Sequence, residues 1–284
     1  MDTPAVDLAS KFEMMDQGQA ERRRLLRWLL VGTATLPLIS CGGASDATAP
    51  ATELEAMDAS EPVAGACAVI PEEMAGPYPA DGTNTYGSSI INVLNQPGIV
   101  RSDIRSSFNG GTAVAAGVPL SIRLQLLNAG AGCASLAGYA IYLWHCDRYG
   151  RYSLYSSGLA GQNYLRGLQE TDGNGMLAFT TIFPGCQPGT LPHVHLEIYP
   201  SLVQAASSSN RIKTSLLTFP MAAARKAYSA SGYETSLANL ANLANLAQTG
   251  ASAGTGQGSS LQMASLTGNA IDGYVARLAV AVNG

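Results

Sequence analysis

Alternation of apolar and polar residues along the middle of the chain predicts β-strands. Leu120 to Leu126 reads Leu-Ser-Ile-Arg-Leu-Gln-Leu, and side chains in a strand point to opposite faces in turn, so this pattern is typical of a half-buried strand. Tyr139 to Trp144 is apolar almost throughout and predicts a more fully buried strand. Met176 to Phe183 and His193 to Tyr199 predict two more.

Glycine-containing turns separate these segments, at Gly130 to Cys133, Gly173 to Gly175 and Pro184-Gly185. Several short strands punctuated by such turns predict an all-β protein, a β-sandwich of mixed or antiparallel strands with minor helices. A Leu-Ala-Asn triplet recurs between Ser236 and Gln248. It predicts a short helix that covers the sandwich, or alternatively one that binds a partner. The segments at 264–267 and 279–282 are expected to be closing strands of the same domain.

Composition limits the classes of protein that this chain can represent. Its 284 residues are 46% hydrophobic, which is enough for a sizeable core, and only 13% are charged. So low a charged fraction suits a β-rich, exported protein. The net charge is -4, and no basic stripe follows the first thirty residues, which argues against a nucleic-acid partner.

The N-terminal segment has the features of an export signal. Arg22 to Arg27 reads Arg-Arg-Arg-Leu-Leu-Arg, the pattern of a twin-arginine signal. The apolar run 28–39 is interrupted by Pro37 and is shorter than the roughly 20 residues that span a bilayer. Leu-Ile-Ser-Cys, ending at Cys41, resembles a bacterial lipobox, in which the cysteine is lipidated. The alternative is a buried amphipathic helix with a chance cysteine.

We therefore expect three parts: a lipoprotein-type twin-arginine signal peptide at 1–41, a flexible tether at 42–65, and one β-sandwich domain at 66–284. The tether is rich in Ala, Thr, Ser, Asp, Glu and Pro and has too little apolar surface to form a core. This arrangement places the domain on the periplasmic side, held at a membrane by a lipid anchor.

Four cysteines remain when Cys41 is set aside: Cys67, Cys133, Cys146 and Cys186. An even number in an oxidising compartment favours two disulfides, with three connectivities that the sequence does not separate. The alternative is that they are free, buried and inert. Their spacing does not resemble a cysteine-based zinc site.

All three histidines lie between Trp144 and His195. His193 and His195 share one face of a predicted strand, roughly 6 to 7 Å apart along it. Two imidazoles in this arrangement can bind one metal ion.

Eight motifs, taken in order, resemble those of the intradiol ring-cleavage dioxygenases, the superfamily of protocatechuate and catechol dioxygenases. No single motif is specific, but their order is. They are Ala75 to Tyr78, Arg101 to Arg105, Trp144 to Asp147, Gly150 to Ser153, Leu165 to Gly167, Thr171 to Gly175, Thr181 to Gly185, and His193 to His195.

The resemblance implies a β-sandwich with a mononuclear non-haem Fe(III) centre bound by two tyrosinates and two histidines. A bound catechol is cleaved by O2 between its two hydroxylated carbons. The first tyrosine ligand of the family falls on Tyr152, and its histidine pair falls on His193 and His195. Phenolate and imidazole are suitable ligands for ferric iron, although the identity of the metal is open.

Three positions depart from the family pattern. The second tyrosine ligand falls on Gln187, the arginine that stabilises negative charge on the substrate falls on Thr190, and a glutamine beyond the histidine strand falls near Leu216. Loss of the tyrosinate leaves a ferric ion less neutralised, so Fe(II), Zn(II) or Cu(II) competes better. Loss of the arginine is expected to cost ~3 kcal/mol, or roughly 100-fold in rate.

The remaining candidates are weaker. We interpret His145 as a hydrogen-bonded structural residue. Glu197 shares the face of the histidine pair and could complete a set of two histidines and one carboxylate, but pairing with a surface cation is the favoured interpretation. Tyr149, Tyr155 and Tyr164 are possible substitutes for the missing tyrosine, with Tyr155 the first to test.

Two functions remain open from the sequence. The first is an exported, membrane-tethered metal dioxygenase that acts on a catecholic aromatic compound with O2. The second is a catalytically impaired or inactive lipoprotein of the same fold that binds metal or an aromatic ligand.

Overall fold

The computed structural model describes residues 68–248 and 259–284. The expected signal peptide and tether lie outside these residues, so the twin-arginine motif and Cys41 remain predictions. The chain divides into two units, Met1–Ala59 and Ser60–Gly284, and the description that follows concerns the second. In the described part, no helix is both long enough and apolar enough to cross a membrane.

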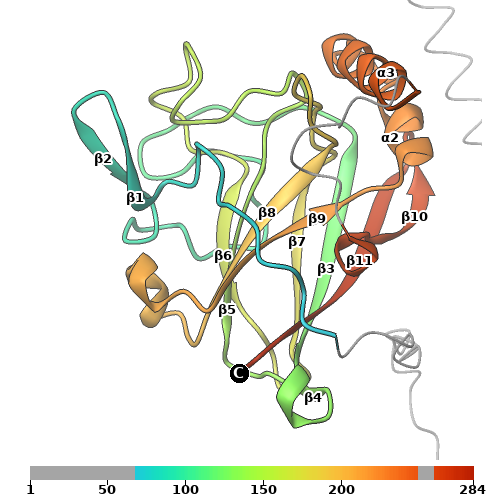
Figure 1. Ribbon diagram of the computed structural model, residues 1–284. Coiled ribbons are helices and arrows are strands. Elements are labelled where there is room, and N and C mark those ends of the chain that lie inside the picture. The colour runs from blue at the N-terminus through green and yellow to red at the C-terminus, as the bar shows by residue number, and fades with distance from the viewer. Residues whose placement is uncertain (1–67, 249–258) are drawn as a thin grey trace, which may run out of the picture. The chain divides into compact units, whose positions relative to one another are not determined.

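Two β-sheets form the body of this unit (Figure 1). The five-stranded sheet has the order β10-β11-β3-β4, and β7 also pairs with β3. Its strands are β3 (Pro119–Asn128), β4 (Ala134–Ser135), β7 (Met176–Ile182), β10 (Ser265–Asn269) and β11 (Gly273–Val282). β11 pairs with β3 in parallel, whereas the other pairs are antiparallel. The sheet is therefore mixed.

The four-stranded sheet is antiparallel throughout and has the order β6-β5-β8-β9. Its strands are β5 (Ala140–Trp144), β6 (Arg166–Glu170), β8 (His193–Tyr199) and β9 (Lys213–Thr218).

Smaller elements complete the unit. A separate hairpin is formed by β1 (Asp81–Tyr86) and β2 (Ser89–Asn92), and it stands to one side of the four-stranded sheet (Figure 1). The helices are α2 (Met221–Ala227) and α3 (Glu234–Gln248), which lie at the end opposite β4. Short 3-10 turns occur at Ala129–Ala131, Gln204–Ala206, Ser208–Asn210 and Ser260–Gln262.

Alternating side chains of the two sheets form one core between them. Leu120, Ile122 and Leu124 of β3 join the same cluster as Leu143 of β5 and Leu196 of β8. Because successive residues in a strand face opposite sides, the neighbours of these β5 and β8 residues point to the outer face of the four-stranded sheet. A second cluster, which includes Tyr142, Trp144, Tyr152 and Tyr199, covers that outer face. The fold is thus an all-β sandwich with minor helices, as predicted, and the histidine strand has two buried faces.

The four strands predicted from the hydrophobic pattern are present as β3, β5, β7 and β8. The burial of β3 alternates as the sequence indicates, and β5 is buried throughout. The Leu-Ala-Asn repeat forms α3, which packs Leu240 and Leu243 into the core. This burial supports a covering helix.

The prediction of two disulfides is wrong for two of the cysteines. Cys146 and Cys186 are free and buried, whereas Cys133 is disulfide-bonded. Cys67 lies outside the described residues. Both free thiols contact backbone carbonyls: Cys146 Sγ lies 3.5 Å from the Gly185 oxygen, and Cys186 Sγ lies 3.2 Å from the Thr190 oxygen. They are the buried, inert cysteines of the alternative interpretation.

Candidate functional site

The histidine pair lies on the outer face of the four-stranded sheet. Val194 and Leu196 of β8 point into the core between the sheets, so His193 and His195 point to the other side. The Nε2 atoms of the two imidazoles approach to 3.1 Å. Two nitrogen ligands of one metal ion, each bonded at about 2.1 Å, can stand this close.

Hydrogen bonding assigns the protons of the pair. His193 Nδ1 lies 2.7 Å from the Leu191 carbonyl, which can only accept, so Nδ1 carries the proton and Nε2 keeps its lone pair. His195 Nε2 then donates to His193 Nε2, and His195 Nδ1 has no hydrogen-bond partner among the described residues. Second-shell contacts of this kind orient metal-binding histidines. His193 has one, and His195 does not.

Burial keeps both imidazoles neutral. It lowers the pKa of His193, and it lowers the pKa of His195 well below the ordinary value, with the neighbouring His193 as the next cause. A neutral imidazole is the form that binds a metal. Both residues are therefore neutral, as ligation requires, although His195 Nε2 still carries its proton.

Two neighbours fix the ring of His195. Trp144 of β5 is the cross-strand partner of His195 and stacks on it, with centroids 4.7 Å apart and an interplanar angle of 5°. On the segment before β1, Gly76 has a φ of +69°, and a Cβ at this position would lie 3.3 Å from His195 Cε1. A side chain would be strained and crowded there, so glycine is favoured at this position of the Ala-Gly-Pro-Tyr motif.

Tyr152 follows β5 in a loop and is buried, with an exposed fraction of 2%. Its ring centroid lies 6.3 Å from that of His195 and 4.8 Å from that of Tyr78. Burial raises the pKa of Tyr152 well above its ordinary value, so the phenol is neutral unless a cation binds its oxygen directly. The structure thus places all three predicted ligands in one region.

Of the three positions that depart from the family pattern, Leu216 lies directly beside the histidine pair. Gln187 lies against Gly150, in the turn that precedes Tyr152. A Cβ added at position 150 would lie 3.5 Å from Gln187 Cγ. The hydroxyl of Thr190 is buried without a hydrogen-bond partner in the described part of the chain. Leu216 of β9 is the direct cross-strand partner of His195 and is 5% exposed. An aliphatic side chain therefore stands beside the histidine pair.

The other tyrosines considered from the sequence have their hydroxyls engaged elsewhere. Tyr155 donates to Asn84 Oδ1 at 2.9 Å, and Tyr164 donates to an Asp147 oxygen at 3.3 Å. The hydroxyl of Tyr149 accepts a hydrogen bond from Arg148 at 2.7 Å. None of them replaces the second tyrosine ligand in this conformation.

His145 has the structural role that was predicted. Its Nδ1 bonds to the Cys146 carbonyl at 2.8 Å and its Nε2 to Thr181 Oγ1 at 2.7 Å. Burial lowers its pKa to about 4. Both ring nitrogens are therefore satisfied, and the ring stays neutral.

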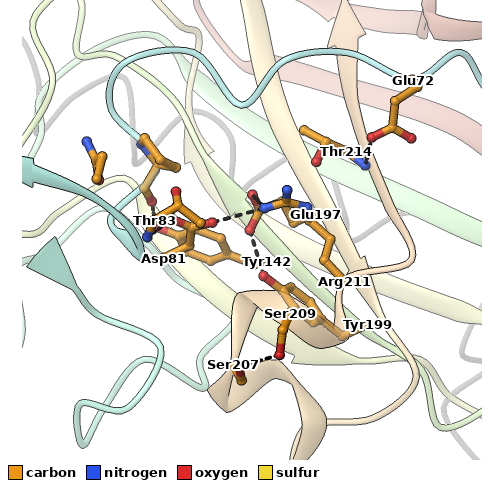
Figure 2. Close-up of polar contacts among 12 residues, drawn as sticks. Glu72, Asp81, Thr83, Tyr142, Glu197, Tyr199, Ser207, Ser209, Arg211 and Thr214 are labelled. Atoms are coloured by element: carbon orange, nitrogen blue, oxygen red, sulfur yellow. Dashed lines mark hydrogen bonds and ion pairs between the residues drawn. The ribbon is translucent and has the colours of Figure 1, made fainter. Parts of the chain in front are cut away.

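Glu197 belongs to a separate polar cluster on the same face (Figure 2). Arg211 Nη1 lies 2.8 Å from Glu197 Oε1 and 3.0 Å from Asp81 Oδ2, and the hydroxyl of Tyr199 donates to Glu197 Oε2. Burial, followed by the charge of Asp81, raises the pKa of Glu197 to about 7. Glu197 thus pairs with a cation, the favoured interpretation.

The donors fit a metal ion only in part. Among the described residues, no group of three or more His, Cys, Asp and Glu side chains could hold a metal, a set that does not include tyrosine. His193, His195 and Tyr152 supply suitable donors for one ion. The second shell is incomplete, however, because a metal on His195 Nε2 would move its proton to the unpartnered Nδ1.

Arg166 is a residue of this region to which sequence reasoning gave no role. It opens β6 within the Leu-Arg-Gly motif and is 1% exposed. Its guanidinium donates to the carbonyls of Tyr78 and Ser153 and to the hydroxyl of Tyr142. The only signal in the sequence was the motif itself.

No family model matches the sequence, and no curated protein matches it. Solved structures do match, and they define the fold as that of intradiol ring-cleavage dioxygenases. The intradiol ring-cleavage dioxygenase from Tetranychus urticae has a TM-score of 0.52 and 21% identity, covering 76% of this chain and 95% of its own. A second structure, described as a dioxygenase, has a TM-score of 0.53, with the same identity and coverage. At this identity the likeness establishes the fold alone.

Proposed function

We propose that this chain is an intradiol-type dioxygenase that binds one metal ion through His193, His195 and Tyr152 and cleaves a catechol-type compound with O2. The observation that carries the proposal is the 3.1 Å approach of the Nε2 atoms of two neutral imidazoles, half-buried His193 and buried His195, beside a buried phenol. The dioxygenase fold of the sandwich supports it.

The residues of the site have different proposed roles. His193 offers the lone pair of Nε2, and His195 offers its Nε2 once that proton has moved to Nδ1. Tyr152 offers an anionic oxygen once its proton is lost to direct ligation. When bound, a ferric ion would supply the Lewis acidity and redox chemistry that activate a catechol toward O2. Trp144 and Gly76 fix the ring of His195, and the outer cluster of aromatic side chains excludes water.

A second candidate is a protein that binds metal and aromatic ligand without turnover. Leu216 directly opposite His195 favours it, as do Gln187 and Thr190 where the family has a tyrosine and an arginine. The proton acceptor and the fixed cation of the family are both absent from these positions. Binding can persist without them, whereas efficient ring cleavage requires a substitute for each.

One experiment separates these candidates. Purified protein is analysed for metal, and its absorption spectrum and O2 uptake with catechol are recorded for the wild type and for His193→Ala. Metal content and an absorption band that disappear in the variant, together with O2 uptake and ring-cleaved product, support the dioxygenase. Metal and catechol binding without O2 uptake supports the second candidate. Absence of metal binding in the wild type refutes both.

A gain-of-function variant tests whether the two replaced residues limit the rate of ring cleavage. Gln187→Tyr with Thr190→Arg restores the two family residues at their positions. We expect the arginine to raise the rate of cleavage by roughly 100-fold. The single variant Gln187→Phe is a matched control, because it adds the ring without the phenol oxygen.

We also propose that the chain is exported and anchored by a lipid on Cys41, as the sequence predicts.

A further inference from the structure

Arg166 carries a buried charge for which the described residues supply no carboxylate. The ion pairs of the described part involve Arg105, Arg151, Arg211 and Lys213 instead. The partners of Arg166 are all neutral, at 2.9 to 3.1 Å: the carbonyls of Tyr78, Pro79 and Ser153, and the hydroxyls of Ser153 and Tyr142. Buried charges are normally paired, so this site has an excess of positive charge.

The excess charge lies on the face of the histidine pair. Arg166 of β6 is in register with Trp144 of β5, which is in register with His195 of β8. Adjacent strands are about 4.8 Å apart, so the backbones of Arg166 and His195 are roughly 10 Å apart. The hydroxyl of Tyr142, which Arg166 contacts, belongs to a ring stacked on Trp144.

The same guanidinium joins the two segments that carry the aromatic rings of the site. One segment contains Tyr78, whose carbonyl accepts from Arg166 Nη1. The other contains Ser153, which follows Tyr152 and accepts from Nε and Nη2. The ring centroids of Tyr78 and Tyr152 are 4.8 Å apart. Arg166 therefore fixes the backbone on both sides of this contact.

An anion in the site would be stabilised by this charge. The family places its arginine at the position of Thr190, where this chain has only a hydroxyl. Among the described residues, Arg166 of β6 supplies a buried and unpaired cation on the face of the histidine pair.

We infer that Arg166 is a positioning residue that holds Tyr78 and Tyr152 in place and provides the fixed positive charge for an anionic oxygen of the bound ligand. The inference rests on the proposed function, since it takes the ligand to be a catechol. It deepens that function by naming the preferred form of the ligand, the catecholate monoanion.

The test uses the full chain treated with a chelator, with 4-nitrocatechol and 4-methylcatechol as probes. The nitro compound ionises near neutral pH, whereas the methyl compound stays neutral. With the backbone separation of roughly 10 Å taken as the distance between the charges, and an effective dielectric of about 20, the charge of Arg166 favours the anion by about tenfold. We expect the affinity for 4-nitrocatechol to rise by about this factor between pH 5 and pH 8, while that for 4-methylcatechol stays constant. If the affinity of the wild type for 4-nitrocatechol does not rise between pH 5 and pH 8, the inference is overturned. This result does not depend on any variant being folded.

Three variants separate charge from positioning. Arg166→Gln should lose the tenfold rise, and Arg166→Lys should keep most of it. Both should bind the neutral probe more weakly, because the forked hydrogen bonds to the two segments are lost. Arg151→Gln is the control, since the Arg151 side chain is 46% exposed and paired with Asp147. The rise in affinity for 4-nitrocatechol should be the same in this variant as in the wild type. A rise that survives in a folded Arg166→Gln variant contradicts the inference.

The outcomes also separate this inference from the proposed function. If both probes bind and their affinities do not depend on ionisation, the role of Arg166 is refuted and the proposed function is not. Binding of neither probe to the metal-free protein refutes the inference, whereas the proposed function is tested separately by metal content and O2 uptake of the wild type.

Discussion

Substitution of Arg211 by methionine should destabilise the protein strongly, because Arg211 is the cation of a buried cluster (Figure 2). Its Nη1 atom lies between Asp81 Oδ2 at 3.0 Å and Glu197 Oε1 at 2.8 Å, and both carboxylate side chains are 0% exposed. Methionine keeps much of the apolar length of the side chain and removes only the charge and its donors. The variant would leave two buried carboxylates without a counter-ion.

The structure sets the expected magnitude. Removing one partner of a buried ion pair costs about 3–5 kcal/mol, because the remaining charge stays desolvated. Arg211 is 27% exposed, and Tyr199 continues to donate to Glu197, so we expect the lower end, about 3 kcal/mol. Many domains are stable by only about 5–15 kcal/mol, so this loss is large.

Urea unfolding at pH 8, followed by circular dichroism, measures the effect as a shift of the midpoint at constant slope. The matched control is Arg105→Met, since Arg105 pairs with Asp103 at 2.6 Å but the two side chains are 42% and 48% exposed. An exposed pair contributes about 0–1 kcal/mol. If the two variants lost the same free energy of unfolding, the assignment of Arg211 to a buried cluster would be wrong.

Three further predictions concern other parts of the chain. Gly76→Ala should weaken metal binding and lower the free energy of unfolding by about 1 kcal/mol or more, because its φ is +69° and the new Cβ would lie 3.3 Å from His195 Cε1; isothermal titration with metal and urea unfolding measure both effects, and unchanged metal affinity would contradict the first. Cys146 and Cys186 should resist a thiol reagent in the folded protein and react after denaturation, because both are buried and burial raises the pKa of each thiol; mass spectrometry identifies the labelled cysteines, and rapid labelling without denaturant would count against burial. Cys41→Ser should move the protein from the membrane fraction to the soluble fraction and abolish incorporation of a labelled fatty acid; retention at the membrane would exclude Cys41 as the anchor.

Local patterns in the sequence were sufficient for much of the fold. The alternation at Leu120 to Leu126 predicted the alternating burial of β3, and the apolar run before Trp144 predicted the complete burial of β5. Both predictions were possible because period-two burial is a local property of a strand. β6 and β9 were not predicted. β6 (Arg166–Glu170) reads Arg-Gly-Leu-Gln-Glu, with one apolar side chain among five residues, so its composition resembles a loop.

The parts of the site that depend on distant contacts could not be predicted. The spacing of His193 and His195 indicated a shared face, but the stacking of Trp144 on His195 arises from the register of β5 against β8. The role of Arg166 depends on carbonyls at positions 78, 79 and 153, which approach only in the folded chain. The buried, free thiol of Cys146 likewise contacts a carbonyl that is distant in sequence, that of Gly185.

The retained and replaced residues differ in chemical role. His193, His195 and Tyr152 are the donors proposed to bind a cation, and they lie together on one face of the four-stranded sheet. Gln187, Thr190 and Leu216 stand where the family pattern has a proton acceptor, a cation and a polar side chain, and none of the three can carry charge at neutral pH. Binding needs the first group and turnover needs both. A chain that keeps the first and replaces the second should therefore bind metal and catechol more readily than it cleaves them.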